Sequence, residues 1–377
     1  MIYLDHAATS PPLHTAMQAF YNAAQSFSGN PNSVHELGRQ ANRQLEGAKN
    51  LVAYCLSCDP EQVIFTSSAS QACDLAMRSM FTACEKIEIV DTDHAATYGF
   101  LEKEISIPTR HLGGRLPKAI SHIHTSNETG QIYSIGHIPQ NYDLIFSDCT
   151  AAMGKSPICF KTAPADLIAG GGHKFGSPVG VGVLIARDPE AVRGAYHPAT
   201  PSVPLAMAFA QALHFRTQHL ALFDDVTARL HDRFVSGIMN EIPDAELNGR
   251  LAAGNEQTQS PYIASISFPG IENHALVLRL SADGLMASSG AACDSGKNEP
   301  SRVLLSEGYT EARARSTVRF SFDYKLDLTS DELQPNFGID ITRDFAIIDE
   351  AVKIVARNVK EMRGQLWHTI AKEQQNV

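Results

Sequence analysis

The order of apolar and polar positions predicts alternating strands and helices over the first two-thirds of the chain. Short apolar runs, typical of buried strands, occur at residues 63–66, 87–90, 120–123, 144–146, 167–168 and 181–186. Outside these runs, apolar positions at helical spacing predict helices, including residues 36–55, 72–81 and 205–222. Strands separated by helices indicate a mainly parallel central sheet with helices on both faces. We therefore predict an α/β fold for this region.

The pattern changes after Glu241. The elements predicted beyond it are strands at residues 264–268 and 317–322 and helices at residues 273–280 and 345–366. They form a smaller α+β unit. We predict a large domain over residues 14–240 and a small domain made of residues 1–13 and 241–377.

Composition narrows the possible functions. The net charge of −10 over 377 residues argues against a nucleic-acid surface, which needs clustered lysine and arginine. No apolar run is long enough to span a membrane, and the first residues lack the features of a secretion signal. Seven scattered cysteines are typical of a reducing compartment, and their spacing favours no metal site. We expect a cytoplasmic protein.

The strongest candidate for chemistry is Lys174, which lies in the glycine-rich segment 170–184. A phosphate-binding P-loop is excluded because Phe175, and not serine or threonine, follows the lysine. A Ser-x-x-Lys nucleophile is excluded because position 171 is glycine. A lysine used for its amine, as in Schiff-base chemistry, remains. The alternative is a glycine hairpin with a solvated lysine, which this segment alone favours.

Asp148 adds a second candidate group, because it directly follows the apolar run at residues 144–146. Ligands of such sheets bind beyond the carboxyl ends of the strands, where Ser70, His94, Asn127 and Lys174 are also expected. A carboxylate after one strand and a lysine after the next is the pair that pyridoxal phosphate requires. A strand-end cap is the alternative role for Asp148.

Several stretches resemble the cysteine desulfurases of the bacterial iron–sulfur type. These enzymes belong to the class V aminotransferase branch of the fold-type I pyridoxal-phosphate enzymes. The matching stretches are residues 3–9, 29–35, 126–130, 172–176 and 288–293, with Glu299, Pro300 and Ser301 and the strand at 317–321 beyond them. The resemblance extends from end to end of the chain. It implies a fold-type I architecture of a large and a small domain, and a homodimer.

The resemblance implies pyridoxal 5′-phosphate as the cofactor and assigns its binding residues. Lys174 would hold it covalently, Asp148 would pair with its pyridinium nitrogen, and Asn127 would bind its phenolic oxygen. The remaining cofactor contacts would come from His94, which stacks on the ring and moves protons, from Ala69, Ser70 and His173 at the phosphate, and from Thr200 toward the partner subunit's phosphate.

The substrate implied is L-cysteine. Arg319 would bind its carboxylate with help from Asn127, and the thiolate of Cys293 would take its sulfur. The products would be L-alanine and a persulfide on Cys293. A sulfur-acceptor protein would then receive the sulfur, for example in iron–sulfur cluster assembly.

The sequence departs from the family pattern around the cofactor. Gly171 stands where a serine usually contacts the phosphate, and Ala151 where a glutamine usually contacts the phenolic oxygen. We expect weaker cofactor binding, since each lost hydrogen bond to a charged group costs ~1.5–3 kcal/mol. Two alternatives stay open. One is a related lyase, such as a selenocysteine lyase, or an aminotransferase; the other is a non-catalytic paralogue.

Overall fold

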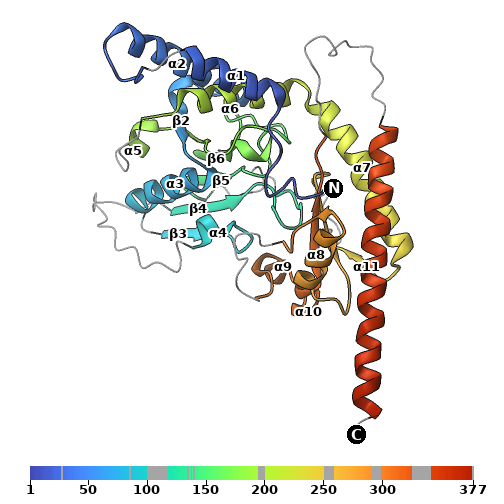
Figure 1. Cartoon of the computed structure of the whole chain (residues 1–377). Helices are drawn as coiled ribbons and strands as arrows, with labels where there is room; N and C mark the ends of the chain where they lie inside the picture. The colour runs from blue at the N-terminus through green and yellow to red at the C-terminus, as the bar shows by residue number, and fades with distance from the viewer. Residues whose placement is uncertain are drawn as a thin grey trace.

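The computed structural model describes residues 1–26, 29–84, 86–99, 118–133, 136, 138, 141–193, 200–249, 259–290, 299–324 and 341–375 (Figure 1). Cys293 and residues 194–199 of the loop before Thr200 lie outside this part.

The first part of the chain contains these elements: β1 (Ile2–Tyr3), α1 (His14–Ser26), α2 (Glu36–Leu56), β2 (Val63–Thr66), α3 (Ala69–Ala83), β3 (Lys86–Ile89), α4 (Ala95–Tyr98), β4 (Lys118–Ile123), β5 (Leu144–Asp148), β6 (Leu167–Gly171), β7 (Gly182–Ala186), α5 (Pro189–Arg193) and α6 (Val203–Gln218). Short 3₁₀ helices, η1 (Pro60–Gln62) and η3 (Gly172–Lys174), precede β2 and follow β6.

The second part contains α7 (Leu220–Glu241), β8 (Glu246–Leu247), β9 (Ile263–Ser267), α8 (Asn273–Ala282), β10 (Leu285–Met286), α9 (Arg302–Ser306), α10 (Glu311–Arg315), β11 (Thr317–Ser321) and α11 (Thr342–Gln375).

The six strands of the central sheet follow the order β2-β7-β6-β5-β4-β3. Strands β3, β4, β5 and β6 are parallel, and β7 alone runs antiparallel to its neighbours β6 and β2. The prediction of a mainly parallel sheet is therefore confirmed. The carboxyl ends of four adjacent parallel strands meet at one edge.

Both faces of this sheet are covered, because successive side chains of a strand point to opposite faces. Ile168, Val183 and Ile185 pack in one cluster with helices α1, α2 and α6. Their neighbours Leu167 and Leu184 pack in another cluster with α3. Continuous apolar strands of this kind are buried on both sides. This confirms the predicted layers of helix, sheet and helix.

The second part of the chain has a core of its own. Strands β11, β9 and β8 form an antiparallel sheet, and α7 and α11 pack side by side against this region (Figure 1). The buried apolar residues of α7 from Val226 to Ile238 belong to this core, although the predicted large domain includes them, whereas Phe223 packs in the core of the first part. The domain boundaries at residues 13 and 240 stay a prediction.

The N-terminal segment connects the two regions. Strand β1 pairs with β10, and the Ala7 amide donates to Ser321 Oγ (2.8 Å). A few residues later the amides of Ser10 and Leu13 donate to the carbonyls of His173 (2.7 Å) and Gly176 (2.8 Å). The segment thus runs from the second core to the turn that carries Lys174.

Two predicted helices differ from the structure by more than a few residues. The helix expected at residues 205–222 is broken at His219, whose φ of −113° and ψ of 17° end α6 before α7 begins. His219 Nδ1 lies 2.9 Å from the carbonyl of Phe215, so the side chain competes with the helix for that acceptor. Helix α11 exceeds the predicted residues 345–366 at both ends. Among the described helices, none combines the length and apolar character needed to cross a bilayer.

A buried ion pair joins the two regions. Arg216 of α6 makes two hydrogen bonds to Asp323, which follows β11, one of them 2.7 Å long from Nη1. The two side chains are only 2% and 4% exposed. By contrast, Arg233 and Asp349, which form a similar pair between α7 and α11, are 43% and 44% exposed.

We expect Asp323→Ala to lower the free energy of unfolding by about 3–5 kcal/mol, because it leaves the Arg216 charge buried without its partner. The matched variant Asp349→Ala removes an exposed pair and should cost at most about 1 kcal/mol. Urea denaturation followed by circular dichroism measures both. Equal losses in the two variants would contradict this account.

Candidate active site

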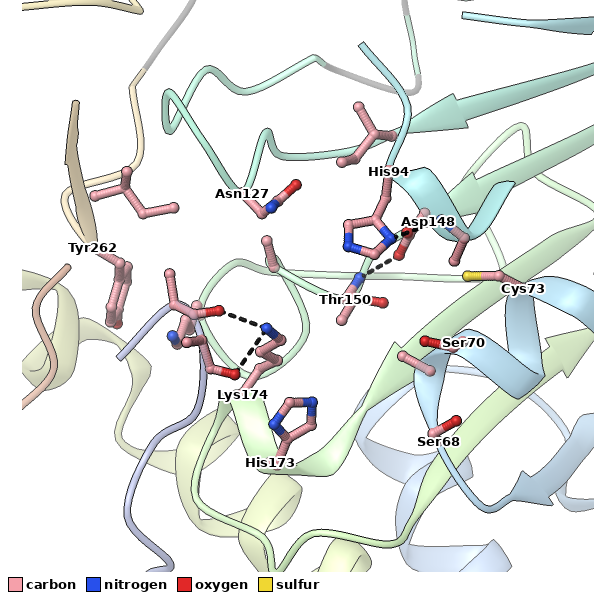
Figure 2. A pocket seen from close by; sticks show the side chains of 18 residues that line it. Ser68, Ser70, Cys73, His94, Asn127, Asp148, Thr150, His173, Lys174 and Tyr262 are labelled. Atoms are coloured by element: carbon pink, nitrogen blue, oxygen red, sulfur yellow. Dashed lines mark hydrogen bonds between the residues drawn. The ribbon is translucent and has the colours of Figure 1, made fainter. Parts of the chain in front are cut away.

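A cavity of about 240 Å³ opens at the edge of the sheet where the parallel strands end (Figure 2). Its lining residues come from segments far apart in the sequence: Ala7, Ala8, Ser68, Ala69, Ser70, Cys73, His94, Ala96, Ile123, Asn127, Asp148, Thr150, Ala151, Lys155, His173, Lys174, Tyr262 and Ile263. The cavity therefore brings together seven of the ten predicted site residues: Ala69, Ser70, His94, Asn127, Asp148, His173 and Lys174.

Lys174 ends η3, which follows β6 directly. Its Nζ donates to the carbonyl oxygens of Ala7 (2.5 Å) and Ala8 (3.0 Å), as the dashed lines in Figure 2 mark. The amine is thereby directed into the cavity by the N-terminal segment. The segment does join the antiparallel strands β6 and β7, but its lysine is hydrogen-bonded and lines the cavity, so the alternative of a solvated lysine is wrong.

Asp148 is the last residue of β5 and is 3% exposed. Its Oδ1 accepts a hydrogen bond from the Thr150 amide (2.9 Å), which holds the carboxylate at the cavity wall. Asn127 follows β4 in a turn in which Ser126 Oγ accepts from the Thr129 amide (3.1 Å). Both side chains reach the same cavity because adjacent parallel strands end there.

His94 precedes α4 as its N-terminal cap. Its Nδ1 accepts from the Ala96 amide (3.1 Å), so a neutral ring carries its proton on Nε2. Figure 2 shows the imidazole beside Asp148 and Thr150. Burial raises the pKa of the preceding Asp93 to about 7. Ser121 Oγ donates to Asp93 (2.5 Å), so this segment is tied to β4.

The N-terminus of α3 forms another wall. Ser68 caps this helix by accepting from the Gln71 amide (3.1 Å), and no hydrogen bond of the Ala69 and Ser70 amides occurs within the described residues. Unpaired amides at a helix N-terminus bind anions, and the helix dipole adds to the attraction. Ser68 and Ser70 lie together on this side of the cavity (Figure 2).

Two glycines let α3 approach the sheet closely. A Cβ on Gly182 would lie 2.5 Å from the Ser68 carbonyl carbon, and a Cβ on Gly171 would lie 2.9 Å from the Ala69 Cβ. Glycine at these positions therefore sets the place of the helix N-terminus. A serine at position 171, as in the family pattern, would require this helix end to shift.

Burial controls the charge of His173. Burial, together with the nearby cations Lys174 and Lys155, lowers the pKa of His173 to about 4. The ring is therefore neutral at pH 7. Burial is also the main cause that lowers the pKa of Lys155, to about 8.

Of the predicted site residues that the structure describes, Arg319 and Thr200 do not line the cavity. Arg319 is 1% exposed, and its guanidinium donates to the carbonyls of Asn127 (2.8 Å) and Gly290 (3.2 Å) and to Asp5 (3.0 Å). Thr200 is exposed, and Cys293 lies outside the described residues. The roles of these three residues stay predictions.

Sequence reasoning missed Lys155, Tyr262 and Cys73. Lys155 lies in the turn after β5, and its ammonium is 5.1 Å from the centroid of the Tyr262 ring. No signal in the sequence distinguishes it from the surface lysines. In the part of the chain that the structure describes, no cluster of histidine, cysteine, aspartate and glutamate could hold a metal ion.

Comparisons with known proteins identify the family and the fold. The family model described as aminotransferase class-V matches residues 2–104 and 109–198. An IscS-like cysteine desulfurase of Mycobacterium tuberculosis is 31% identical over 370 residues, covering 86% of this chain and 92% of the relative. A cysteine desulfurase of Nostoc sp. is 28% identical over 356 residues, covering 85% of this chain and 88% of the relative. A solved NifS-like protein shares the fold, with a TM-score of 0.76 at 21% identity over 95% of this chain and 99% of that one.

The described thiols differ in reactivity. Cys73 lines the cavity, but burial, with Asp148 and Asp93 nearby, raises the pKa of its thiol well above the usual value. Cys159 is exposed, and hydrogen bonds from Thr162 and Ser57 lower the pKa of its thiol. A reactive cysteine needs both access and thiolate character. Cys73 lines the cavity but lacks thiolate character, because its raised pKa keeps the thiol protonated, so it is not the nucleophile of this cavity.

We expect iodoacetamide at pH 7.5 to modify Cys159 first among the six described cysteines, at least about tenfold faster than Cys73, because alkylation requires the thiolate. Peptide mass spectrometry over time measures the order. A Cys159→Ser variant should lose this first label and keep the others. Labelling of Cys73 in the folded protein at a similar rate would overturn the assignment.

Proposed function

Because the chain belongs to the aminotransferase class-V family, among its cysteine desulfurases, we propose that this cavity removes sulfur from L-cysteine with the help of pyridoxal phosphate. The observation that carries the proposal is the arrangement of Lys174, Asp148 and the N-terminus of α3 around one cavity. An amine, a buried carboxylate and an anion site are the groups that this cofactor needs.

The residues present fit the cofactor. Lys174 supplies the amine for its aldehyde carbon, and Asp148 supplies a carboxylate for its ring nitrogen. The unpaired amides of Ala69 and Ser70, with the Ser70 hydroxyl, suit the phosphate. When bound, pyridoxal phosphate takes up the electron pair left on the substrate carbon after proton removal. The cavity lacks the usual glutamine at position 151, so we retain the expectation of weaker binding.

The chain's own residues then have separate tasks. His94, whose neutral ring carries its proton on Nε2, would stack on the cofactor ring and take part in proton transfer. Asn127 offers its amide to the phenolic oxygen and to the substrate. The Lys174 amine would hold the cofactor and, when free, would accept the proton from the substrate α-carbon. Its neighbour His173 is neutral, so it contributes a hydrogen bond to phosphate without adding charge.

We propose Cys293 as the sulfur acceptor. Its thiolate attacks the substrate sulfur, so that a sulfur–sulfur bond forms as the carbon–sulfur bond breaks. The electron pair of the broken bond stays on carbon, which takes up a proton to give L-alanine. Support comes from Gly290 at the start of this loop, whose carbonyl accepts from the same Arg319 guanidinium as Asn127 of the cavity (3.2 and 2.8 Å).

We further propose that the protein works as a homodimer in which Thr200 reaches the partner subunit's phosphate. Its exposed side chain is compatible with that role. The persulfide would pass to a sulfur-acceptor protein. The six described cysteines are unpaired, which supports a cytoplasmic location.

We expect Lys174→Ala to abolish covalent cofactor binding, because no other amine would then be held at this position by Ala7 and Ala8. The purified variant should be colourless, and borohydride reduction should fix no pyridoxyl group to a peptide. Lys161→Ala, which removes an exposed lysine, should match the parent. A stable pyridoxyl adduct on another lysine of the Lys174 variant would show the assignment to be wrong.

We expect Cys293→Ala to bind the cofactor and L-cysteine like the parent but to lose at least about a hundredfold in sulfide release, since the nucleophile is gone. Mass spectrometry should detect no persulfide on the variant. Cys159→Ala, which removes an exposed thiol away from the cavity, should keep the parent's rate. Undiminished sulfide release by Cys293→Ala would favour a lyase instead.

A further inference from the structure

Lys155 is a second lysine in the cavity that the mechanism above does not use. Its side chain is 6% exposed and lines the cavity, with the ammonium 5.1 Å from the centroid of the Tyr262 ring. Within the described residues its ammonium makes no hydrogen bond and no ion pair, and only its backbone amide donates, to Ala152 (2.8 Å). A buried ammonium without an acceptor is costly, so the site favours an anionic ligand at this place.

The carboxylate that attracts Lys155 does not form an ion pair with it. Asp323 attracts it, but the Asp323 oxygens already accept from Arg216 Nη1 (2.7 Å), Arg216 Nη2 and Ser10 Oγ (3.1 Å). Arg216, Lys174 and Arg319 repel the ammonium. This corner of the cavity therefore carries an excess of positive charge.

The position of Lys155 identifies the anion. Figure 2 shows Tyr262 on the opposite side of the cavity from Ser68 and Ser70. Since Lys155 lies against Tyr262, its ammonium is at the end of the cavity remote from the helix N-terminus that suits the phosphate. The other anionic group that enters such a cavity is the carboxylate of the amino-acid substrate.

Arg319 is less available for that carboxylate in this structure. Its two terminal nitrogens donate to Asn127, Gly290 and Asp5, and its side chain is not part of the cavity wall. We propose that Lys155 binds the substrate carboxylate inside the cavity, an inference that rests on the proposed amino-acid chemistry of this site.

This role gives binding a dependence on pH. The ammonium of Lys155, with a pKa of about 8, holds a carboxylate below that pH and loses it as the pH rises above it. The surrounding groups are His6, neutral because its pKa is about 4, Tyr262, whose pKa burial raises, and the charged Asp323, Arg216, Lys174 and Arg319. Tyr262 also donates to Asp224 (2.8 Å) and remains protonated.

Two probes separate the carboxylate from the rest of the substrate. 3-Mercaptopropionate has the carboxylate and thiol of L-cysteine without its amine, and cysteamine has the amine and thiol without the carboxylate. Calorimetry with the cofactor-loaded protein measures both dissociation constants at pH 7 and pH 9. Lys155→Met and Lys155→Arg are the test variants, and Lys161→Met is the matched surface control.

We expect Lys155→Met to weaken 3-mercaptopropionate binding roughly ten- to hundredfold, as for one charged hydrogen bond, and to change cysteamine binding by less than about twofold. In the parent, 3-mercaptopropionate binding should weaken between pH 7 and pH 9. Lys155→Arg should bind it equally at both, because arginine stays charged. Lys161→Met should match the parent.

Equal binding of 3-mercaptopropionate by the parent and Lys155→Met would overturn the inference, as would an equal loss for both probes. Sulfide release from L-cysteine by the parent is measured separately. If the parent releases no sulfide but Lys155 still controls carboxylate binding, the desulfurase proposal fails and the assignment of Lys155 stands.

Discussion

Both the fold and the cavity depend on the contacts that the buried guanidinium of Arg216 makes. It forms an ion pair with Asp323 after β11, donates to the Phe175 carbonyl (3.1 Å) and lies 4.0 Å from the centroid of the Phe223 ring. Ser10 Oγ lies within hydrogen-bond distance of Asp323 (3.1 Å) and of the Lys174 carbonyl (3.2 Å). The Arg216–Asp323 pair thus connects helix α6, the N-terminal segment, the second core and the turn that carries Lys174.

The cavity is cationic in a chain whose net charge is −10. Its positive groups lie at two places, the N-terminus of α3 and the corner of Lys155 beside Tyr262. Burial keeps His173 neutral between them, which limits the excess charge. Such a division suits a ligand pair with two separate anionic groups, a phosphate and an amino-acid carboxylate.

Much of the site could be predicted because its residues directly follow strands, and the apolar pattern of the sequence reveals those strands. His94, Asn127, Asp148 and Lys174 each follow a strand that the apolar pattern reveals, and parallel strands end at a common edge. The break at His219 was not predictable, because both sides of it have helical periodicity. Only the backbone angles and the contact of its ring with the Phe215 carbonyl end the helix there.

The sequence by itself determined the alternation of strands and helices, the glycines beside α3 and the order of the reactive residues. Tertiary structure alone decided that Lys155 shares a cavity wall with Tyr262, and that Arg319 is held by Asp5 and Gly290. The physical reason is that a side chain's charge partners come from segments far apart in the chain. Pattern and spacing describe neighbours along the chain, whereas burial and charge depend on neighbours in space.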